Sequence, residues 1–274
     1  MKYLKSMVAI AVLPLLATTQ VNAKEVSAED AAKELANPNT AFASLTFKNQ
    51  FKSMEDGREI SHTLFQPTLP FMLDDGDKVI FRPAVPIVYD NGNGESGIGD
   101  LGFDLVYAPK AEDPTDLLAY GMVGSLPIGN SDIGAGEVTA VGPALFVGKF
   151  VGKGKTLVGA YTSHLESVDE GDLGEAGEMS ITSSQLMYIN IGDGGWAYGS
   201  APKIEYNHNA EDEKLTLPVN FTISKTTIIA GRPWKFGLDL DYYVQKDEDF
   251  GPDYMVTFSI TPVVENMFNT WLHQ

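Results

Sequence analysis

The sequence predicts an all-β protein that folds as a single antiparallel, membrane-spanning barrel of about twelve strands, preceded by a short N-terminal helix. Three observations predict this fold: many short segments alternate apolar and polar residues, an export signal precedes them, and the chain contains no cysteine. Alternation with a period of two indicates strands, because successive side chains point to opposite faces of a sheet. The clearest segment has one apolar face, formed by Phe236, Leu238, Leu240, Tyr242 and Val244.

Residues 1–23 have the composition of a cleaved signal peptide. Two lysines begin this segment, an apolar run covers 7–16, and Val21-Asn22-Ala23 provides small residues for cleavage. The run is too short for a membrane anchor, because a spanning helix needs about 20 apolar residues. We therefore expect four parts: a signal peptide at 1–23, an N-terminal periplasmic helix at 24–40, the barrel at 41–262 and a C-terminal tail at 263–274.

The charge and composition exclude several classes of function. The formal charge is −18, and it becomes −20 once the two lysines of the signal peptide are removed. Nucleic acid is excluded as a partner, because binding it requires a basic patch. The absence of cysteine excludes a disulfide-stapled secreted domain. The stretch nearest to a calcium loop, Asp90-Asn91-Gly92-Asn93-Gly94-Glu95, misses the spacing of such a loop, and we expect no cofactor or metal.

One helical stretch and twelve strand candidates follow the signal peptide. The helix covers 27–36, where Ser27 with Asp30 makes a capping box and Asn37-Pro38 ends the helix. It would either plug the lumen or lie at the periplasmic mouth as a strut. Most strand candidates have about ten residues, which suits a tilted strand that crosses a bilayer. They are 41–51, 59–72, 77–89, 98–108, 117–128, 138–149, 155–166, 181–191, 195–207, 214–224, 235–245 and 253–262.

The connections between these strands divide into two sets that differ in charge. With the N-terminus on the periplasmic side, the outward connections carry a summed formal charge of −15, against −2 for the inward turns. An even number of strands places both termini on one side, as bacterial outer-membrane barrels require. The most acidic outward connection, 167–179, would bind divalent cations, contact lipopolysaccharide or remain solvated.

Prolines inside strand candidates predict local irregularities. Proline has no backbone N–H, so it leaves one position of a β-ladder without a donor. We expect bulges, bends or shortened strands at Pro67, Pro70, Pro83, Pro86, Pro202 and Pro218. The candidate at 181–191 alternates weakly, and its register is not predicted.

An ordered set of short motifs resembles a known bacterial family. The set begins with Leu35-Ala36-Asn37-Pro38 and continues with 44–51, 82–89, 97–102, 142–144, 231–233, 241–243, 251–254 and 258–261. It is similar to the outer-membrane transporter family of the meta-pathway of phenol degradation. The resemblance implies an outer-membrane barrel of a Gram-negative bacterium that moves small molecules, including aromatic or hydrophobic ones. It implies no catalytic residues.

The C-terminal tail departs from this family, whose members tend to end on an aromatic residue shortly after the last strand. Here 263–274 continues for a dozen residues. Val264, Met267, Phe268 and Trp271 have helical spacing, so the tail is either a short amphipathic helix or a frayed extension.

The polar faces of the strands predict the residues that line the lumen. A charge that faces lipid at mid-depth costs about 2–4 kcal/mol for Arg or Lys, so charged side chains belong inside. The set comprises Arg82, Asp104, Lys203, Glu205, Asp239 and Asp241. Four acids against two bases would line a polar pore with a mild preference for cations. Alternatively, they would form a salt-bridge network that fills the barrel and conducts nothing.

Aromatic residues near strand ends predict the two membrane interfaces. We expect girdles at the headgroup level, where aromatic side chains of barrels gather. The residues are Trp196, Tyr198, Tyr206, Trp234, Tyr242 and Tyr254. Stacking on a ligand is the alternative use of these residues.

The leading hypothesis is a passive outer-membrane channel or transporter for small molecules, and not an enzyme. The alternatives are a barrel enzyme of the lipid-hydrolase type, and a structural or adhesive surface barrel. A hydrolase needs a serine beside a histidine base, and neither His62, His164 nor His208 has one at a neighbouring position on the same strand face. Expected partners are outer-membrane lipid, lipopolysaccharide, an unidentified small-molecule cargo and, during insertion, the barrel-assembly machinery.

Overall fold

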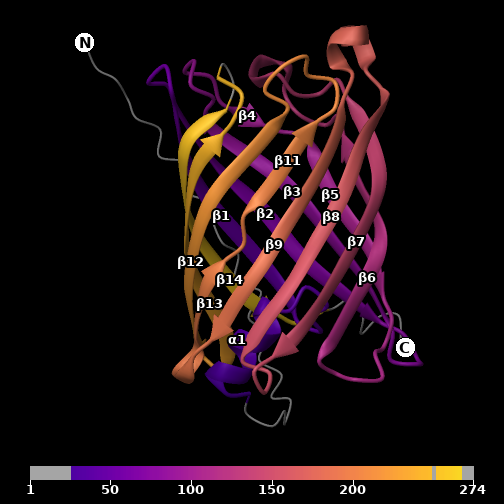
Figure 1. The fold of residues 1–274 in the computed structure, drawn as a ribbon, viewed down its shortest axis with the longest axis vertical. Coiled ribbons are helices and arrows are strands. Elements are labelled where there is room, and N and C mark those ends of the chain that lie inside the picture. The colour runs from indigo at the N-terminus through magenta and orange to yellow at the C-terminus, as the bar shows by residue number, and fades with distance from the viewer. Residues whose placement is uncertain (1–25, 249–250, 267–274) are drawn as a thin grey trace.

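The computed structural model describes residues 26–248 and 251–266, which form a closed antiparallel barrel of twelve strands with a helix at one end (Figure 1). The helix is α1 (Ala28–Ala36). The strands are β1 (Ala43–Met54), β2 (Glu59–Met72), β3 (Lys78–Asp90), β4 (Gly97–Ile98), β5 (Leu101–Ala108), β6 (Asp116–Leu126), β7 (Thr139–Val151), β8 (Thr156–Asp169), β9 (Ser180–Ile191), β10 (Trp196–Ser200), β11 (Lys203–Asn207), β12 (Leu215–Ile229), β13 (Arg232–Gln245) and β14 (Pro252–Val264).

Two of these strand segments do not add to the count of twelve. β10 and β11 are halves of one barrel strand, because both lie between β9 and β12. β4 has two residues and pairs with β3 just before β5 begins. The predicted fold class is confirmed, and every strand candidate is present with its ends within five residues of the predicted ones.

The N-terminal helix and the last strand of the barrel lie close to their predicted positions. The predicted helix forms: the Ser27 hydroxyl accepts a hydrogen bond from the Asp30 N–H (3.0 Å) and donates one to the Asp30 carboxylate (2.7 Å). β14 continues to Val264, so the barrel extends two residues beyond the predicted end at 262. The predicted signal peptide (1–23) and tail residues 267–274 lie outside the described residues.

The barrel closes between the first and last strands of the chain. β1 pairs with β14 from Ala43↔Val264 to Met54↔Pro252, with a register shift at the last pair. β14 also pairs with β13, so both of its edges are occupied. Closure satisfies the backbone groups that an open edge would leave unpaired in lipid. Among the described residues, no helix is long and apolar enough to cross a membrane.

The two faces of the wall differ as the alternation predicts. On β13 the apolar residues lie outside: Leu240 is 41%, Val244 54% and Tyr242 62% exposed. Asp239 and Asp241, on either side of Leu240, line the interior. Five of the six expected girdle aromatics are exposed on the outside: Trp196, Tyr198, Tyr206, Tyr242 and Tyr254.

The prolines disturb the wall at some positions only. The barrel strand breaks between β10 and β11 at Ala201-Pro202, and the register of β12 against β13 shifts between Leu217 and Pro218. The β2–β3 ladder is interrupted between Phe65↔Val85 and Leu69↔Phe81, where Pro67 and Pro83 face each other, and β3 changes its partner from β5 to β4 around Pro86. Pro70 keeps its ladder partner Ile80 without a register shift, so the expected irregularity is absent there.

A buried apolar cluster fills part of the barrel interior on the side of β3, β5, β6, β7 and β8. Its members are Ile80, Val106, Ala108, Leu117, Ala119, Val123, Ala144, Phe146, Phe150 and Leu157. Helix α1 adds a second cluster, in which Ala32 packs against Ile191 and Ala197. The interior is therefore neither an open pore along its whole length nor completely filled.

Candidate functional site

The candidate site is a cavity of about 840 Å³ inside the barrel. Residues from eleven of the twelve barrel strands line it, together with Leu35 and Ala36 at the end of α1 and Asn37, Pro38 and Thr40 after it. Most lining side chains are polar on the β1, β12, β13 and β14 side, where serines and threonines alternate with charged residues. This distribution follows from strands that turn every second residue inward.

The structure places all six residues of the predicted pore lining at this cavity: Arg82, Asp104, Lys203, Glu205, Asp239 and Asp241. Three lysines line the same cavity and were missed: Lys48, Lys52 and Lys235. The alternation itself could have found them. Phe47 and Phe51 are exposed on the outside, so the lysine that follows each of them points inward.

The additional lysines change the charge of the lining. The described lining holds five bases and four acids, a formal charge of +1. The predicted surplus of acids is therefore wrong, and with it the reason for a cation preference. The lumen is slightly positive although the whole chain carries −18.

Arg82 and Asp104 form an ion pair in the lining, and Tyr161 and Pro38 bind to it. They are register partners on β3 and β5, and their charged atoms lie 3.8 Å apart. The Tyr161 hydroxyl, from β8, donates to the Asp104 carboxylate at 2.7 Å. Arg82 also donates to the Pro38 carbonyl, so this group connects the barrel wall to the segment after α1.

Most of the other carboxylates also have close partners. Glu205 lies 2.7 Å from the Lys203 ammonium and accepts a hydrogen bond from the Ser183 hydroxyl at 3.0 Å. Asp241 accepts from the Asn220 amide at 2.8 Å. The predicted salt-bridge network is thus present in part, as two local ion pairs within a cavity that remains.

The lysines on β1 and β13 have a different environment. Among the described residues, Lys48, Lys52 and Lys235 have no carboxylate within 4 Å. Lys48 donates to the Gln66 side chain at 2.9 Å. It also interacts electrostatically with two acids and two bases of the lining: Asp239, Lys235, Asp104 and Arg82. The positive charge of this wall is therefore only partly compensated.

The N-terminal segment lies across the end of the barrel where α1 is seen in Figure 1. Lys78 donates to the Asn39 carbonyl, and the Asn39 amide donates to the Leu118 carbonyl at 2.9 Å. Lys33 of α1 lies over the Phe150 ring, 4.8 Å from its centroid. These contacts favour a segment that narrows the lumen over one that merely touches the rim.

An ion pair outside the membrane-spanning part holds α1 at this end. Lys155, in the turn before β8, lies 2.9 Å from Asp193 and 3.3 Å from Glu29 of α1. The hydrogen bond with Asp193 raises the pKa of Lys155 above 10.5, and Lys155 lowers the pKa of Asp193 below 3.8. The Lys155–Asp193 contact is lost as pH rises through the folded pKa of Lys155 or falls through that of Asp193, so this contact persists across the neutral range.

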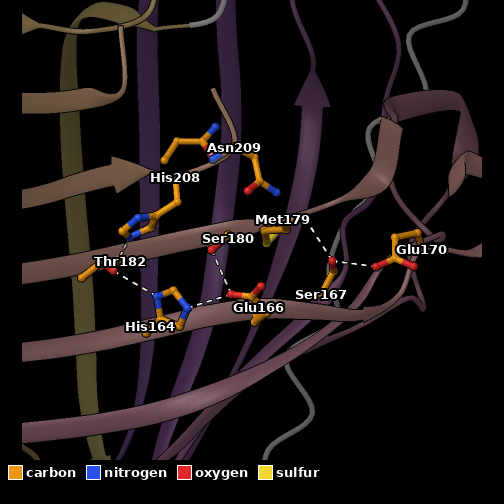
Figure 2. A network of polar contacts seen from close by, with 10 residues as sticks. His164, Glu166, Ser167, Glu170, Met179, Ser180, Thr182, His208 and Asn209 are labelled. Atoms are coloured by element: carbon orange, nitrogen blue, oxygen red, sulfur yellow. Dashed lines mark hydrogen bonds and ion pairs between the residues drawn. The ribbon is translucent and has the colours of Figure 1, made fainter. Parts of the chain in front are cut away.

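Two histidines, His164 and His208, form a network on the outer face of the wall (Figure 2). The Thr182 hydroxyl lies 3.0 Å from His164 Nδ1 and 2.9 Å from His208 Nε2. His164 Nε2 lies 2.8 Å from the Glu166 carboxylate, to which the Ser180 hydroxyl also donates. His164 faces away from the lumen, because its neighbours Ser163 and Leu165 line the cavity.

This network does not provide a serine hydrolase. Ser180 donates to a carboxylate, and the hydroxyl beside the two histidines belongs to Thr182. In the described part of the chain, no group of three metal-ligating side chains has the geometry to hold a metal ion. Sequence reasoning missed Thr182 because it lies on the neighbouring strand, in register with His164.

Comparison with solved structures agrees with this architecture. One similar structure is an outer-membrane channel from Pseudomonas putida F1, with a TM-score of 0.63, 16% identity, and coverage of 81% of this chain and 96% of that one. Another is the NanC porin, with a TM-score of 0.55, 10% identity, and coverage of 81% and 99%. At these identities the likeness shows a shared fold. No family model and no curated protein matches the chain, so the resemblance to the phenol-pathway family stays a prediction.

Proposed function

We propose that the protein is a passive channel in the outer membrane of a Gram-negative bacterium, through which small molecules cross the barrel lumen. The observation that carries the proposal is the charged and polar cavity of about 840 Å³ inside a wall whose outer face is apolar. A soluble barrel would place its charges outside and its apolar residues inside. The fold shared with an outer-membrane channel and a porin supports the proposal.

The proposal also covers the surroundings of the barrel. The outer apolar face contacts outer-membrane lipid, the acidic outward connections face lipopolysaccharide, and the barrel-assembly machinery inserts the protein. The apolar cluster inside the barrel supports a cargo that is at least partly aromatic or aliphatic.

The test is single-channel conductance of refolded residues 24–274 in a planar bilayer. Discrete conductance steps that scale with salt concentration are the expected result. The channel would be contradicted if the protein gives no conductance steps and no permeation of small solutes into liposomes, although its heat-modifiable gel mobility shows that it is folded.

Neutralising opposite charges on β13 is expected to shift the ion selectivity in opposite directions. Lys235 and Asp239 line the cavity on the same face of this strand. Asp239→Asn raises the charge of the described lining from +1 to +2 and should increase anion preference, while Lys235→Gln lowers it to zero and should increase cation preference. Reversal potentials in a salt gradient measure both shifts. If the two variants shift in the same direction or not at all, these residues do not face the permeation path.

A further inference from the structure

We propose that the lumen binds organic carboxylates with an apolar body, such as aromatic or short aliphatic acids, with the carboxylate held by Lys48 and Lys235. This inference rests on the channel proposed above and names the class of molecule that the cavity selects.

The charges that line the barrel interior are compensated unevenly. Asp104, Glu205 and Asp241 each have a hydrogen-bond partner within 3.0 Å. The lysines on β1 and β13 have no carboxylate within 4 Å among the described residues. The fourth acid, Asp239, is the carboxylate that interacts most strongly with both Lys48 and Lys235, but it lies more than 4 Å from either. Two cations thus share one distant acid, and because a cation removed from water with incomplete compensation is costly, an anion that enters this wall is stabilised.

The wall between Lys48 and Lys235 contains a recess that a ligand can enter. Across the wall, Lys48 is in register with Ser259 of β14, and Ser259 is in register with Gly237 of β13. Gly237 also lies one inward position from Lys235. A Cβ atom at Gly237 would come within 2.4 Å of the Ser259 hydroxyl, so glycine keeps this recess open. The Ser259 hydroxyl is a donor suited to a carboxylate.

The opposite side of the cavity carries apolar side chains. Leu157 and Leu165 of β8 and Met187 and Ile189 of β9 line it there, beside the polar Tyr161, Ser163, Ser183 and Gln185 of the same strands. These four residues belong to or pack against the buried apolar cluster. In the closed order of strands, β8 lies directly across the barrel from β1. A molecule that spans the cavity therefore meets cations at one end and apolar side chains at the other.

These features together define the ligand. An inorganic anion would use the lysines alone, and a neutral hydrocarbon would use the apolar wall alone. A carboxylate with an aromatic or aliphatic body uses both, and a cavity of about 840 Å³ lies within the range of about 300–1,000 Å³ that is typical of small-molecule sites.

The experiment is isothermal titration calorimetry of the refolded protein in lipid nanodiscs, with empty nanodiscs as the blank. The probes are benzoate, benzyl alcohol and chloride. We expect benzoate to bind at least about tenfold more tightly than either of the others, since a charge-assisted hydrogen bond contributes enough to change the affinity by this factor.

Two variants separate the contributions. Lys48→Gln with Lys235→Gln should weaken benzoate binding at least tenfold and leave benzyl alcohol unchanged. Met187→Gln with Leu165→Asn should weaken both organic probes. The control, Lys110→Gln with Lys153→Gln, removes the same charge from exposed turns and should bind benzoate like the wild type.

The outcomes distinguish this inference from the channel itself. Conductance steps together with equal affinities for benzoate and benzyl alcohol would overturn the carboxylate site and leave the channel standing. Selective benzoate binding without conductance or solute permeation would support the site and contradict the channel. Benzoate binding that survives the double lysine variant would also overturn the site.

Discussion

Release of the N-terminal segment is expected to raise the conductance of the protein severalfold, and a cross-link between α1 and the wall is expected to keep it low. Leu35, Ala36, Asn37 and Pro38 line the cavity, so their removal widens the lumen at its narrowed end. The hydrogen bonds from Arg82 and Lys78 to this segment come from charged donors, each worth about 1.5–3 kcal/mol, so spontaneous release is rare.

A cysteine pair offers a reversible form of this experiment, because the chain has no cysteine of its own. Ala32 of α1 and Ala197 of β10 belong to the same buried cluster, which makes Ala32→Cys with Ala197→Cys the natural pair. The oxidised double variant should stay at the low conductance level. Reduction in the same bilayer should restore transitions to the level of the protein that lacks residues 24–38.

The single variants Ala32→Cys and Ala197→Cys, treated with the same oxidant, are the matched controls. They should behave like the wild type under both conditions. Equal conductance of the oxidised, reduced and truncated proteins would mean that α1 is a strut that does not restrict passage.

Replacement of Gly142 by alanine is expected to destabilise the barrel by about 1–3 kcal/mol, the usual cost of forcing an extra carbon into a packed position. A Cβ atom at Gly142 on β7 would lie 1.8 Å from the His164 carbonyl oxygen on β8. That neighbour is backbone, so the atom can be accommodated only if two hydrogen-bonded strands separate. The ladder between β7 and β8 already lacks two pairs here, at Gly142 and Pro143, between Val141↔Glu166 and Ala144↔Ser163.

Gly102 of β5 provides the matched comparison. A Cβ atom there would meet nothing closer than 3.7 Å, which is an ordinary contact. Gly102→Ala should therefore be neutral or slightly stabilising, because alanine loses less backbone entropy than glycine on folding. Urea unfolding followed by tryptophan fluorescence in phospholipid vesicles measures both variants. Equal stability of the two would show that the strands at Gly142 separate without cost.

The alternation of residues predicted the wall well because a barrel in lipid imposes one rule on every strand. Asp239 and Asp241 could be placed inside from their own segment alone, and Lys48 and Lys52 could have been placed by the same rule. The apolar interior could not, because Val106 and Phe146 point inward where the rule expects polar side chains. Their inward position depends on packing against other strands.

Contacts between strands were beyond the reach of the sequence for a further reason. The pairing of Arg82 with Asp104, and of His164 with Thr182, depends on the register of neighbouring strands. Register follows from turn geometry and from the summed pairing of whole strands. The anchoring of Pro38 by Arg82 depends in addition on where α1 enters the barrel.

The break between β10 and β11 gives Asn220 of β12 a second role. β11 and β12 share only two ladder pairs. At the break, the side-chain oxygen of Asn220 accepts a hydrogen bond from the Ala201 N–H at 2.7 Å, and the backbone carbonyl of Asn220 accepts one from the Ser200 hydroxyl at 2.8 Å. The same amide group donates to Asp241. A side chain of the lumen here completes the seam of the wall. Substitutions at Asn220 or Asp241 therefore alter the pairing of the barrel wall together with the polarity of the lumen. Substitutions at Asp239 and Lys235 change only the charge of the lumen.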